Sequence, residues 1–194
     1  MRPVPEHALK EWGVTVHALS RGDQVLILRK GGIGEKRFEL PHPRFFLFPT
    51  YAHQRPELVK PEFRSRFAAS LDRRDDPERL PLPAYAEIAA SFAVTEQSQL
   101  DALDHLHILT PDYAAERLRW RRKHPLWAVA LRVWRLDDPP VLEVTPEHLG
   151  CVSWVALPDR MAPSAMTPAL SDDAFAAGLA DVQSVLQQPA GAAA

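Results

Sequence analysis

The residues of this chain that could carry chemistry gather in two segments. The first, residues 29–54, opens with Arg29 and Lys30, which run directly into Gly31 and Gly32. Glycines let the backbone approach an anion closely and the two cations supply charge, so the pattern favours contact with a phosphate. The alternative is a tight connection between strands with solvated ends, since the nucleotide-binding patterns G-x-x-x-x-G-K-[ST] and G-x-G-x-x-G are both absent.

Polar side chains in the same segment surround an aromatic run, FFLF. Glu39 and His42 precede this run, and three further polar residues follow it. Histidine titrates near neutral pH and can serve as a general base or metal ligand, so we expect a cleft with His53 and Glu39 as catalytic candidates. The candidate ligand-binding residues are His42, Thr50 and Gln54. The alternative is that Thr50 caps a turn and His53 satisfies a loop carbonyl.

The second segment, residues 116–127, reads ERLRWRRKHPLW and is strongly basic. Five of the seven residues 117–123 are Arg or Lys, and Trp120 lies among them. Cations interleaved with an aromatic ring suit phosphate neutralisation and base stacking, so this segment is a second candidate phosphate-binding edge. Its candidate ligand-binding residues are Arg119, Arg121, Arg122 and Lys123. The alternative is a solvated helix end, where cations suit the helix dipole.

Other residues give weaker patterns. His105 and His107 form an H-x-H pair, but neither a nearby cysteine nor an H-E-x-x-H pattern accompanies them, so we expect no metal site. The single cysteine, Cys151, excludes a disulfide framework, and its apolar flanks predict a small buried residue. None of the five lysines has Asp or Glu two residues before it, which argues against a D/E-x-K nuclease element. No cofactor is indicated by any motif.

Composition bounds the class of protein. The chain has 194 residues, of which 46% are apolar and 25% charged, values ordinary for a globular domain. The net charge of −2 excludes a wholly basic nucleic-acid coat, although residues 1–70 carry 12 Lys or Arg and only 7 Asp or Glu. No apolar run approaches the ~20 residues that span a bilayer, and the N-terminus has no apolar signal region. We therefore expect a cytoplasmic protein with no membrane partner.

The elements that must position these groups follow from hydrophobic periodicity. Strands are expected over residues 14–19, 24–30, 36–40, 45–48, 86–94, 126–134, 141–144 and 151–157. Helices are expected over 6–12, 62–72, 96–104, 111–120 (with Thr110 as N-cap) and 172–188. The first two strands should form a hairpin about Gly22. Because strands and helices do not alternate as βαβ units, the pattern favours an α+β fold with a curled, mostly antiparallel sheet and peripheral helices. We expect one domain over 1–157, then an extension over 158–194 with a weak helix and a disordered end.

Several sequence blocks resemble one bacterial family. KEWGVTVHAL, LILRKGGI, FLFPTYAHQ, RWRRKHPLWAVALRVWRL and GCVSWVAL, within residues 8–157, resemble the signature blocks of domain of unknown function 1802. That family has no established activity. Its association with a restriction-endonuclease-type domain implies a role in restriction–modification or another nucleic-acid transaction, with an endonuclease-type partner protein. More faintly, EWGVTVHALSRGDQVLILRK resembles the opening of PUA-like barrels of the ASCH type, which implies that the curled sheet forms a barrel. It also resembles the first strands of a Nudix hydrolase, but the carboxylate-rich Nudix helix is missing.

Three functions are compatible with these patterns. The first is a nucleic-acid-binding module, for DNA or RNA, in which both basic segments meet phosphates. The second is a metal- or His-dependent hydrolase of a phosphodiester or nucleotide, with His53 as base, Glu39 as metal ligand or acid, and Lys30 stabilising the developing anion. The third is a protein-interaction scaffold that uses an apolar patch on the Trp-rich strands. The choice depends on whether the two basic segments meet in space.

Overall fold

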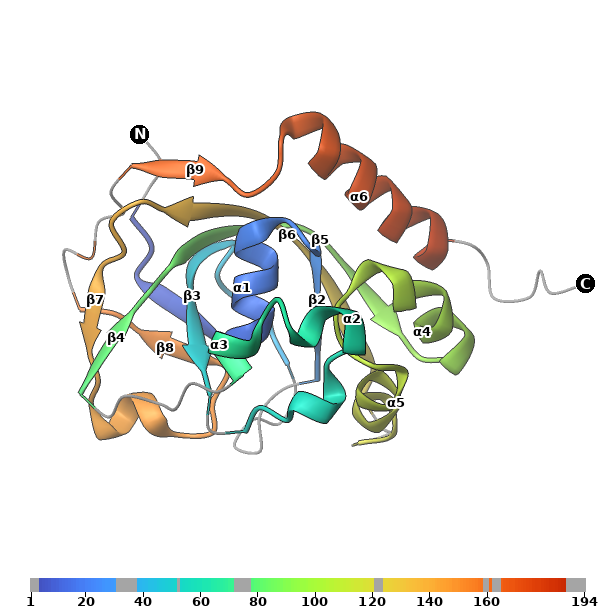
Figure 1. The fold of residues 1–194 in the computed structure, drawn as a ribbon, viewed down its shortest axis with the longest axis horizontal. Coiled ribbons are helices and arrows are strands. Elements are labelled where there is room, and N and C mark those ends of the chain that lie inside the picture. The colour runs from blue at the N-terminus through green and yellow to red at the C-terminus, as the bar shows by residue number, and fades with distance from the viewer. Residues whose placement is uncertain are drawn as a thin grey trace, which may run out of the picture.

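A curled seven-stranded sheet frames the molecule (Figure 1). The computed structural model describes residues 4–30, 38–51, 53–71, 78–120, 124–158, 161 and 165–187. The strands of this sheet are β1 (His7–Trp12), β2 (Leu26–Arg29), β3 (Arg44–Thr50), β5 (Ala84–Val94), β6 (Leu126–Leu136), β8 (Trp154–Ala156) and β9 (Met166–Pro168). Their order is β2-β6-β5-β3-β1-β8, and β9 also pairs with β6. A separate two-stranded sheet consists of β4 (Arg79–Pro81) and β7 (Val141–Glu143).

The expected fold class is confirmed, except for the closed barrel. Every strand pair in the large sheet is antiparallel apart from β1 and β3, which run parallel. Within the described part of the chain, β2 and β8 each pair with a single strand, so the hydrogen-bonded ladder stays open between them. The fold is therefore α+β with a mixed, mostly antiparallel, curled sheet.

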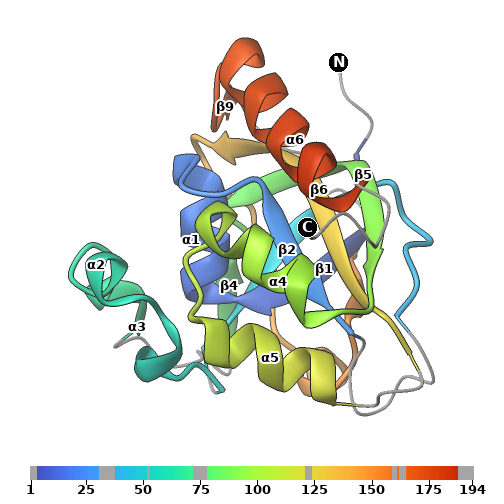
Figure 2. The ribbon, with the colours of Figure 1, turned by 90° about the vertical axis from the view of Figure 1, so that its right-hand side faces the viewer.

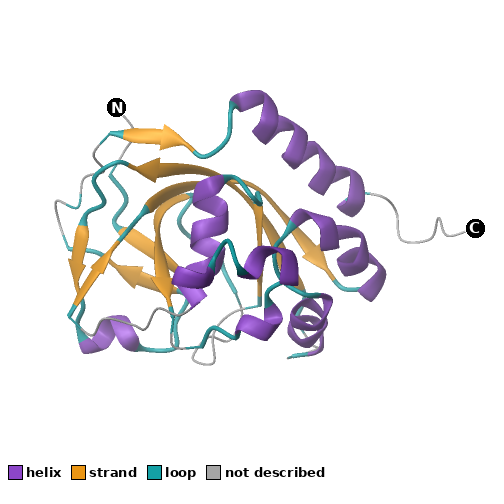
Figure 3. Ribbon diagram, viewed as in Figure 1, coloured by secondary structure: helices purple, strands orange, loops and turns teal. Residues whose placement is uncertain are grey.

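Helices cover the sheet from two sides. The helices are α1 (Gly13–Arg21), α2 (Pro61–Arg64), α3 (Ala68–Leu71), α4 (Gln97–Leu103), α5 (Pro111–Arg119) and α6 (Asp172–Leu186), with short 3-10 turns at Pro56–Leu58, Asp104–Leu106 and Pro146–Leu149. Helix α1 lies within the curve of the sheet, where Val16 and Leu19 pack against β3 and β6 (Figures 1 and 3). Helices α6, α4 and α5 follow one another on the side next to β2 (Figure 2). This second group of helices places the C-terminal end of α5 beside β2.

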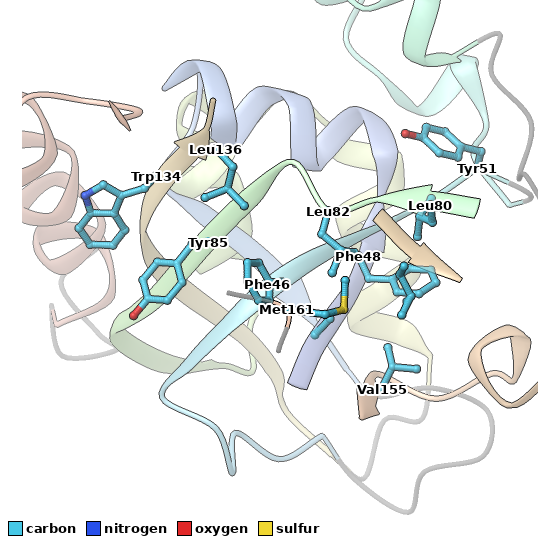
Figure 4. Close-up of a cluster of buried hydrophobic side chains, with 12 residues drawn as sticks. Phe46, Phe48, Tyr51, Leu80, Leu82, Tyr85, Trp134, Leu136, Val155 and Met161 are labelled. Carbon is cyan, nitrogen blue, oxygen red and sulfur yellow. The ribbon is translucent and has the colours of Figure 1, made fainter. Parts of the chain in front are cut away.

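Strand β3 runs through the middle of the core. Because successive side chains of a strand point to opposite faces, Phe46 and Phe48 enter one hydrophobic cluster and Phe45 and Leu47 enter another. Figure 4 shows the first cluster, which also contains Tyr85 and side chains from the small sheet. Burial on both faces explains why this stretch reads as a continuous apolar run rather than an alternating one.

The expected N-terminal elements are wrong in type. Residues 6–12, expected as a helix, contain strand β1, and residues 14–19, expected as a strand, lie in helix α1. Strand β1 gains its structure from tertiary pairing, since it lies between β3 and β8 and pairs with both. Gly22 ends α1 instead of turning a hairpin. Its φ of 76° is left-handed, and the backbone N–H groups of Gly22 and Asp23 donate to carbonyls of the last helical turn.

Most later elements are confirmed, with three differences. Strand β3 continues through Pro49, and described residues 38–40 are irregular rather than a strand. The helix expected over 62–72 is split into α2 and α3, with residues 65–67 between them in turn conformation. The elements expected over 24–30, 86–94, 96–104, 111–120, 126–134, 141–144, 151–157 and 172–188 are present with shifted ends. Thr110 caps α5 as expected, since its Oγ1 accepts from the backbone N–H of Tyr113 at 3.4 Å.

The segment after residue 158 is attached to the same sheet and core. Strand β9 pairs with the end of β6, and Val182 of α6 is fully buried against residues of β2 and α4. The end expected to be disordered, 189–194, lies outside the described residues. None of the helices that the structure describes is both long and apolar enough to cross a membrane.

Gly13 is required where β1 turns into α1. A Cβ at this position would lie 2.1 Å from Cε1 of Tyr51, whose ring is buried in the core. Gly13→Ala is therefore expected to lower the free energy of unfolding by about 1–3 kcal/mol, the usual cost of overpacking. Chemical denaturation measures this loss. Gly150→Ala is the matched control, since its Cβ would meet no atom closer than 3.7 Å, and an equal loss in both variants would contradict the steric explanation.

Candidate ligand-binding pocket

A pocket of about 830 Å³ lies at the open edge of the curled sheet. Its walls come from β1, the C-terminal ends of β2 and β3, the C-terminal end of α5, and segment 148–153. These elements are distant in sequence and meet because α5 packs next to β2 while segment 148–153 leads into β8, beside β1. A volume of this size is typical of pockets that bind small ligands or single nucleotides.

The two basic segments of the sequence converge on this pocket. Arg29 and Lys30 line it from the end of β2, and Arg117, Arg119 and Trp120 line it from the end of α5. The remaining members of these segments, Gly31, Gly32, Arg121, Arg122 and Lys123, lie outside the described residues. The described members of both basic segments therefore meet in space. This meeting is the condition on which the choice between the functions depends.

The pocket carries an excess of positive charge. Of the described residues that line it, five carry cationic side chains and two, Glu11 and Glu116, carry carboxylates. Glu11 is engaged by Arg29 inside the pocket, and Glu116 pairs at 2.8 Å with Arg55, which does not line it. The described lining residues therefore carry a net positive charge, and such a concave cationic surface attracts anions.

Arg29 joins the two edges of the open sheet. Its guanidinium crosses from β2 to β1, where it donates to the carbonyl of Lys10 at 2.9 Å and lies 3.2 Å from Oε2 of Glu11. It also donates to Oγ of Ser153, ahead of β8, at 2.7 Å. Glu11 is only 5% exposed, so this is a largely buried ion pair. The Arg29 side chain thus connects β2 to β1 and to the residue before β8, across the side of the sheet where the described strands are not joined by backbone hydrogen bonds.

Lys30, which directly follows β2, is a buried cation whose ammonium contacts the C-terminal end of α5. It is 3% exposed, and its Nζ donates to the carbonyl of Leu118 at 2.5 Å. Burial removes water from the ammonium and lowers its pKa from the usual value. Among the residues that the structure describes, no carboxylate pairs with Lys30. In the described part of the chain, the carbonyl end of the helix is what stabilises this charge.

Of the three polar candidates at and just after the end of β3, two line the pocket and one does not. His53 is exposed at the pocket, and Thr50 lines it while donating from Oγ1 to the carbonyl of Glu11 at 3.2 Å. Gln54 has a different position. Its Oε1 accepts from the backbone N–H of Val14 at 2.7 Å and its Nε2 donates to the carbonyl of Ser70 at 3.0 Å. The Gln54 amide therefore joins α1 to α3.

The two candidates that precede β3 lie elsewhere. Glu39 lines a second pocket, of about 620 Å³, together with residues such as His124 and Trp127. His42 stacks on His7 with ring centroids 3.6 Å apart, and desolvation together with the charge of His7 lowers its pKa. Glu39 and His53 thus do not share a pocket, and the catalytic arrangement expected from the sequence is not assembled.

A family model that matches most of the chain decides which family the chain belongs to. The model for "Domain of unknown function (DUF1802)" matches residues 8–181. This chain belongs to the DUF1802 family. The family region extends beyond residue 157, where the sequence blocks ended, and so includes β9 and most of α6. A search of curated protein sequences finds no match to this DUF1802 chain.

Two solved structures of an ASCH protein from Zymomonas mobilis are similar to this DUF1802 chain. The S128A mutant shares 12% identity at a TM-score of 0.46, and the match covers 81% of this chain and 92% of that one. The protein described as ASCH shares 12% identity at a TM-score of 0.46, with coverage of 80% and 89%.

Segment 148–153 contributes pocket residues that the sequence did not indicate. Leu149 and Val152 are 56% and 39% exposed, and Cys151, expected to be buried, is exposed between them. Lys10 holds the segment by donating from Nζ to the carbonyl of Gly150 at 2.7 Å. Apolar flanks misled the prediction for Cys151, because these flanks form the wall of a pocket in this DUF1802 chain rather than part of its core.

The H-x-H pair does not form a paired site in the structure. His107 is buried at 3% exposure, whereas His105 is exposed. Across the described ranges, no group of three or more His, Cys, Asp or Glu side chains is placed to hold a metal ion.

Proposed function

We propose that this DUF1802 protein is a nucleic-acid-binding module and that the pocket at the open edge of the sheet is its binding site. The observation that carries the proposal is the convergence of Arg29 and Lys30 with Arg117 and Arg119 around one pocket. Cations from two distant segments that face one cavity are arranged for an anion rather than for solvent. This supports a phosphate-bearing ligand over the solvated-end alternatives.

The end of α5 also supplies aromatic surface. Half-buried Trp120 lines the pocket beside the cations, whereas Trp12 of β1 lines it at only 8% exposure, packed against Tyr113 in the core. Proteins that bind single strands combine a cationic groove with rings on which bases stack. The chemical composition of the pocket therefore favours an unpaired nucleotide of DNA or RNA.

The two alternative functions gain less support. A hydrolase that uses His53, Glu39 and Lys30 together would need all three in one pocket, and Glu39 lies in another. A scaffold built on Trp-rich strands would need a broad apolar face, whereas Trp134 is buried and Trp127 and Trp154 are half-buried. The restriction–modification setting and the endonuclease-type partner protein belong to the same proposal, and they are supported by the family resemblance alone.

Charge reversal at Arg119 is expected to weaken nucleic-acid binding by at least about tenfold at low salt, or about 1.4 kcal/mol. Arg119 is exposed at the pocket and pairs with no carboxylate in the described part of the chain. Fluorescence anisotropy with labelled single- and double-stranded DNA and RNA, across a salt series, measures the effect. Arg119→Gln should also lower the salt slope by about 0.7 for a single strand, since one phosphate contact is lost.

The matched control for this prediction is Arg135→Glu. Arg135 is an exposed arginine of β6 that does not line the pocket, so its reversal should leave the affinity close to wild type. Equal weakening by both reversals would mean that binding depends on overall charge and not on the pocket. Failure of the wild-type protein to bind any strand at low salt would refute the proposed function.

A further inference from the structure

We infer that the pocket binds the phosphorylated end of a nucleic-acid strand, with the terminal phosphomonoester at Lys30. This inference rests on the proposed function and specifies which part of the strand enters. Its first support is the uncompensated charge of Lys30, which is buried to 3% exposure yet faces the pocket without a carboxylate partner among the described residues. A buried ammonium stabilised only by a helix-end carbonyl is costly, and an anion in the pocket would supply the missing charge.

The burial of the cations favours a chain end. Of the cations that line the pocket, Arg119 is exposed and Lys30 is almost fully buried. A phosphate that meets Lys30 therefore has to enter the pocket. An internal phosphate carries chain on both sides and would have to bring two nucleotides with it. A terminal phosphate carries chain on one side only.

The charge of the pocket also suits a phosphomonoester. A terminal phosphate carries about −1.5 to −2 at pH 7, because its second pKa is near 6, whereas an internal phosphodiester carries −1. Among the described residues, five cations and two carboxylates line the pocket, which gives this part of the lining an excess of three positive charges. The more highly charged group gains more from this excess, so the monoester should be preferred.

The opposite wall provides a place for the terminal base. Leu149 and Val152 are among the four most exposed large apolar side chains that the structure describes, and both line the pocket. A base lying against them, with Trp120 on the side of α5, would cover this apolar surface. A terminal nucleotide would thus place its base on the apolar wall and its phosphate on the cationic one.

The test compares three single-stranded oligonucleotides of one sequence with an internal label. One has hydroxyls at both ends, one a 5′-phosphate, and one a 3′-phosphate. We expect one phosphorylated end to bind at least about tenfold more tightly, and the preferred end identifies the polarity. The matching mononucleotide should compete, and the nucleoside should not. Equal affinity of the three strands would overturn this inference while leaving the proposed function intact if binding still depends on Arg119.

Variants assign the preference to Lys30. Lys30→Met should abolish the preference for the phosphorylated end while residual binding of the unphosphorylated strand persists. If it weakens all three strands by the same factor, Lys30 only positions α5 and the inference is wrong. Lys60→Met is the matched control, because Lys60 also donates from a largely buried Nζ to backbone carbonyls but does not line the pocket. The mononucleotide competition uses the wild-type protein and so decides the inference even if Lys30→Met fails to fold.

Discussion

Replacing Arg29 by methionine is expected to lower the free energy of unfolding by about 3–5 kcal/mol. The change leaves the carboxylate of Glu11, which is 5% exposed, buried beside an apolar side chain. It also removes the hydrogen bonds to the carbonyl of Lys10 and to Ser153 that join β2 to the opposite edge of the sheet. Urea denaturation followed by circular dichroism measures the loss.

Two further variants separate the cost of a buried unpaired carboxylate from the cost of losing an ion pair at the surface. Adding Glu11→Leu to Arg29→Met should restore most of the stability, since neither member of this ion pair is then left buried without the other. Arg44→Met removes the exposed pair with Glu87, at 3.4 Å, and should cost less than about 1 kcal/mol. If Arg29→Met costs no more than Arg44→Met, Arg29 does not stabilise the open edge of the sheet.

Acidification is expected to destabilise the protein through His107. Burial, and secondarily the charge of Lys60, lowers the pKa of His107 to about 4 from its usual 6.5. Below pH 6.5 the unfolded chain binds a proton at His107 that the folded protein does not bind. The stability that His107 contributes is therefore complete above about pH 6.5 and is lost as the pH falls toward 4. The loss at pH 5 should be about 2 kcal/mol.

Comparison of wild type with His107→Leu isolates this effect from other titrating groups. The difference in unfolding free energy between the two proteins should shift by about 2 kcal/mol in favour of the variant from pH 7.5 to pH 5. His105→Leu, at an exposed position two residues away, should keep the acid loss of the wild type. A difference between wild type and His107→Leu that stays constant over this pH range would show that His107 has no such role.

The sequence by itself determined the elements whose signals are local. Thr110 followed by Pro111 fixes the start of α5, because a side-chain cap and a proline at the first turn act within a few residues. The long apolar runs indicate β5 and β6 for a similar reason, since a run of neighbouring apolar residues is itself a local signal for a strand. The α+β class and the DUF1802 membership also follow from the chain alone.

Local signals fail where long-range pairing decides the conformation. Residues 6–12 have a helical pattern, yet β1 is a strand because β3 and β8 pair with it from positions distant in sequence. Gly22 is equally suited to a hairpin or a helix end, and only the packing of α1 within the sheet selects the second. Such choices depend on contacts between distant segments, which no short window of sequence contains.

The candidate site shows the same division. Residue type and spacing identified Arg29, Lys30 and Arg119 as cations that could meet an anion, and all three line one pocket. Only the tertiary structure decided that Arg29 is engaged with Glu11, that Glu39 lies in a second pocket, and that segment 148–153 completes the first. Charge and polarity belong to a residue and are visible in the sequence. Burial and convergence belong to the packing of distant elements, so only the folded chain reveals them.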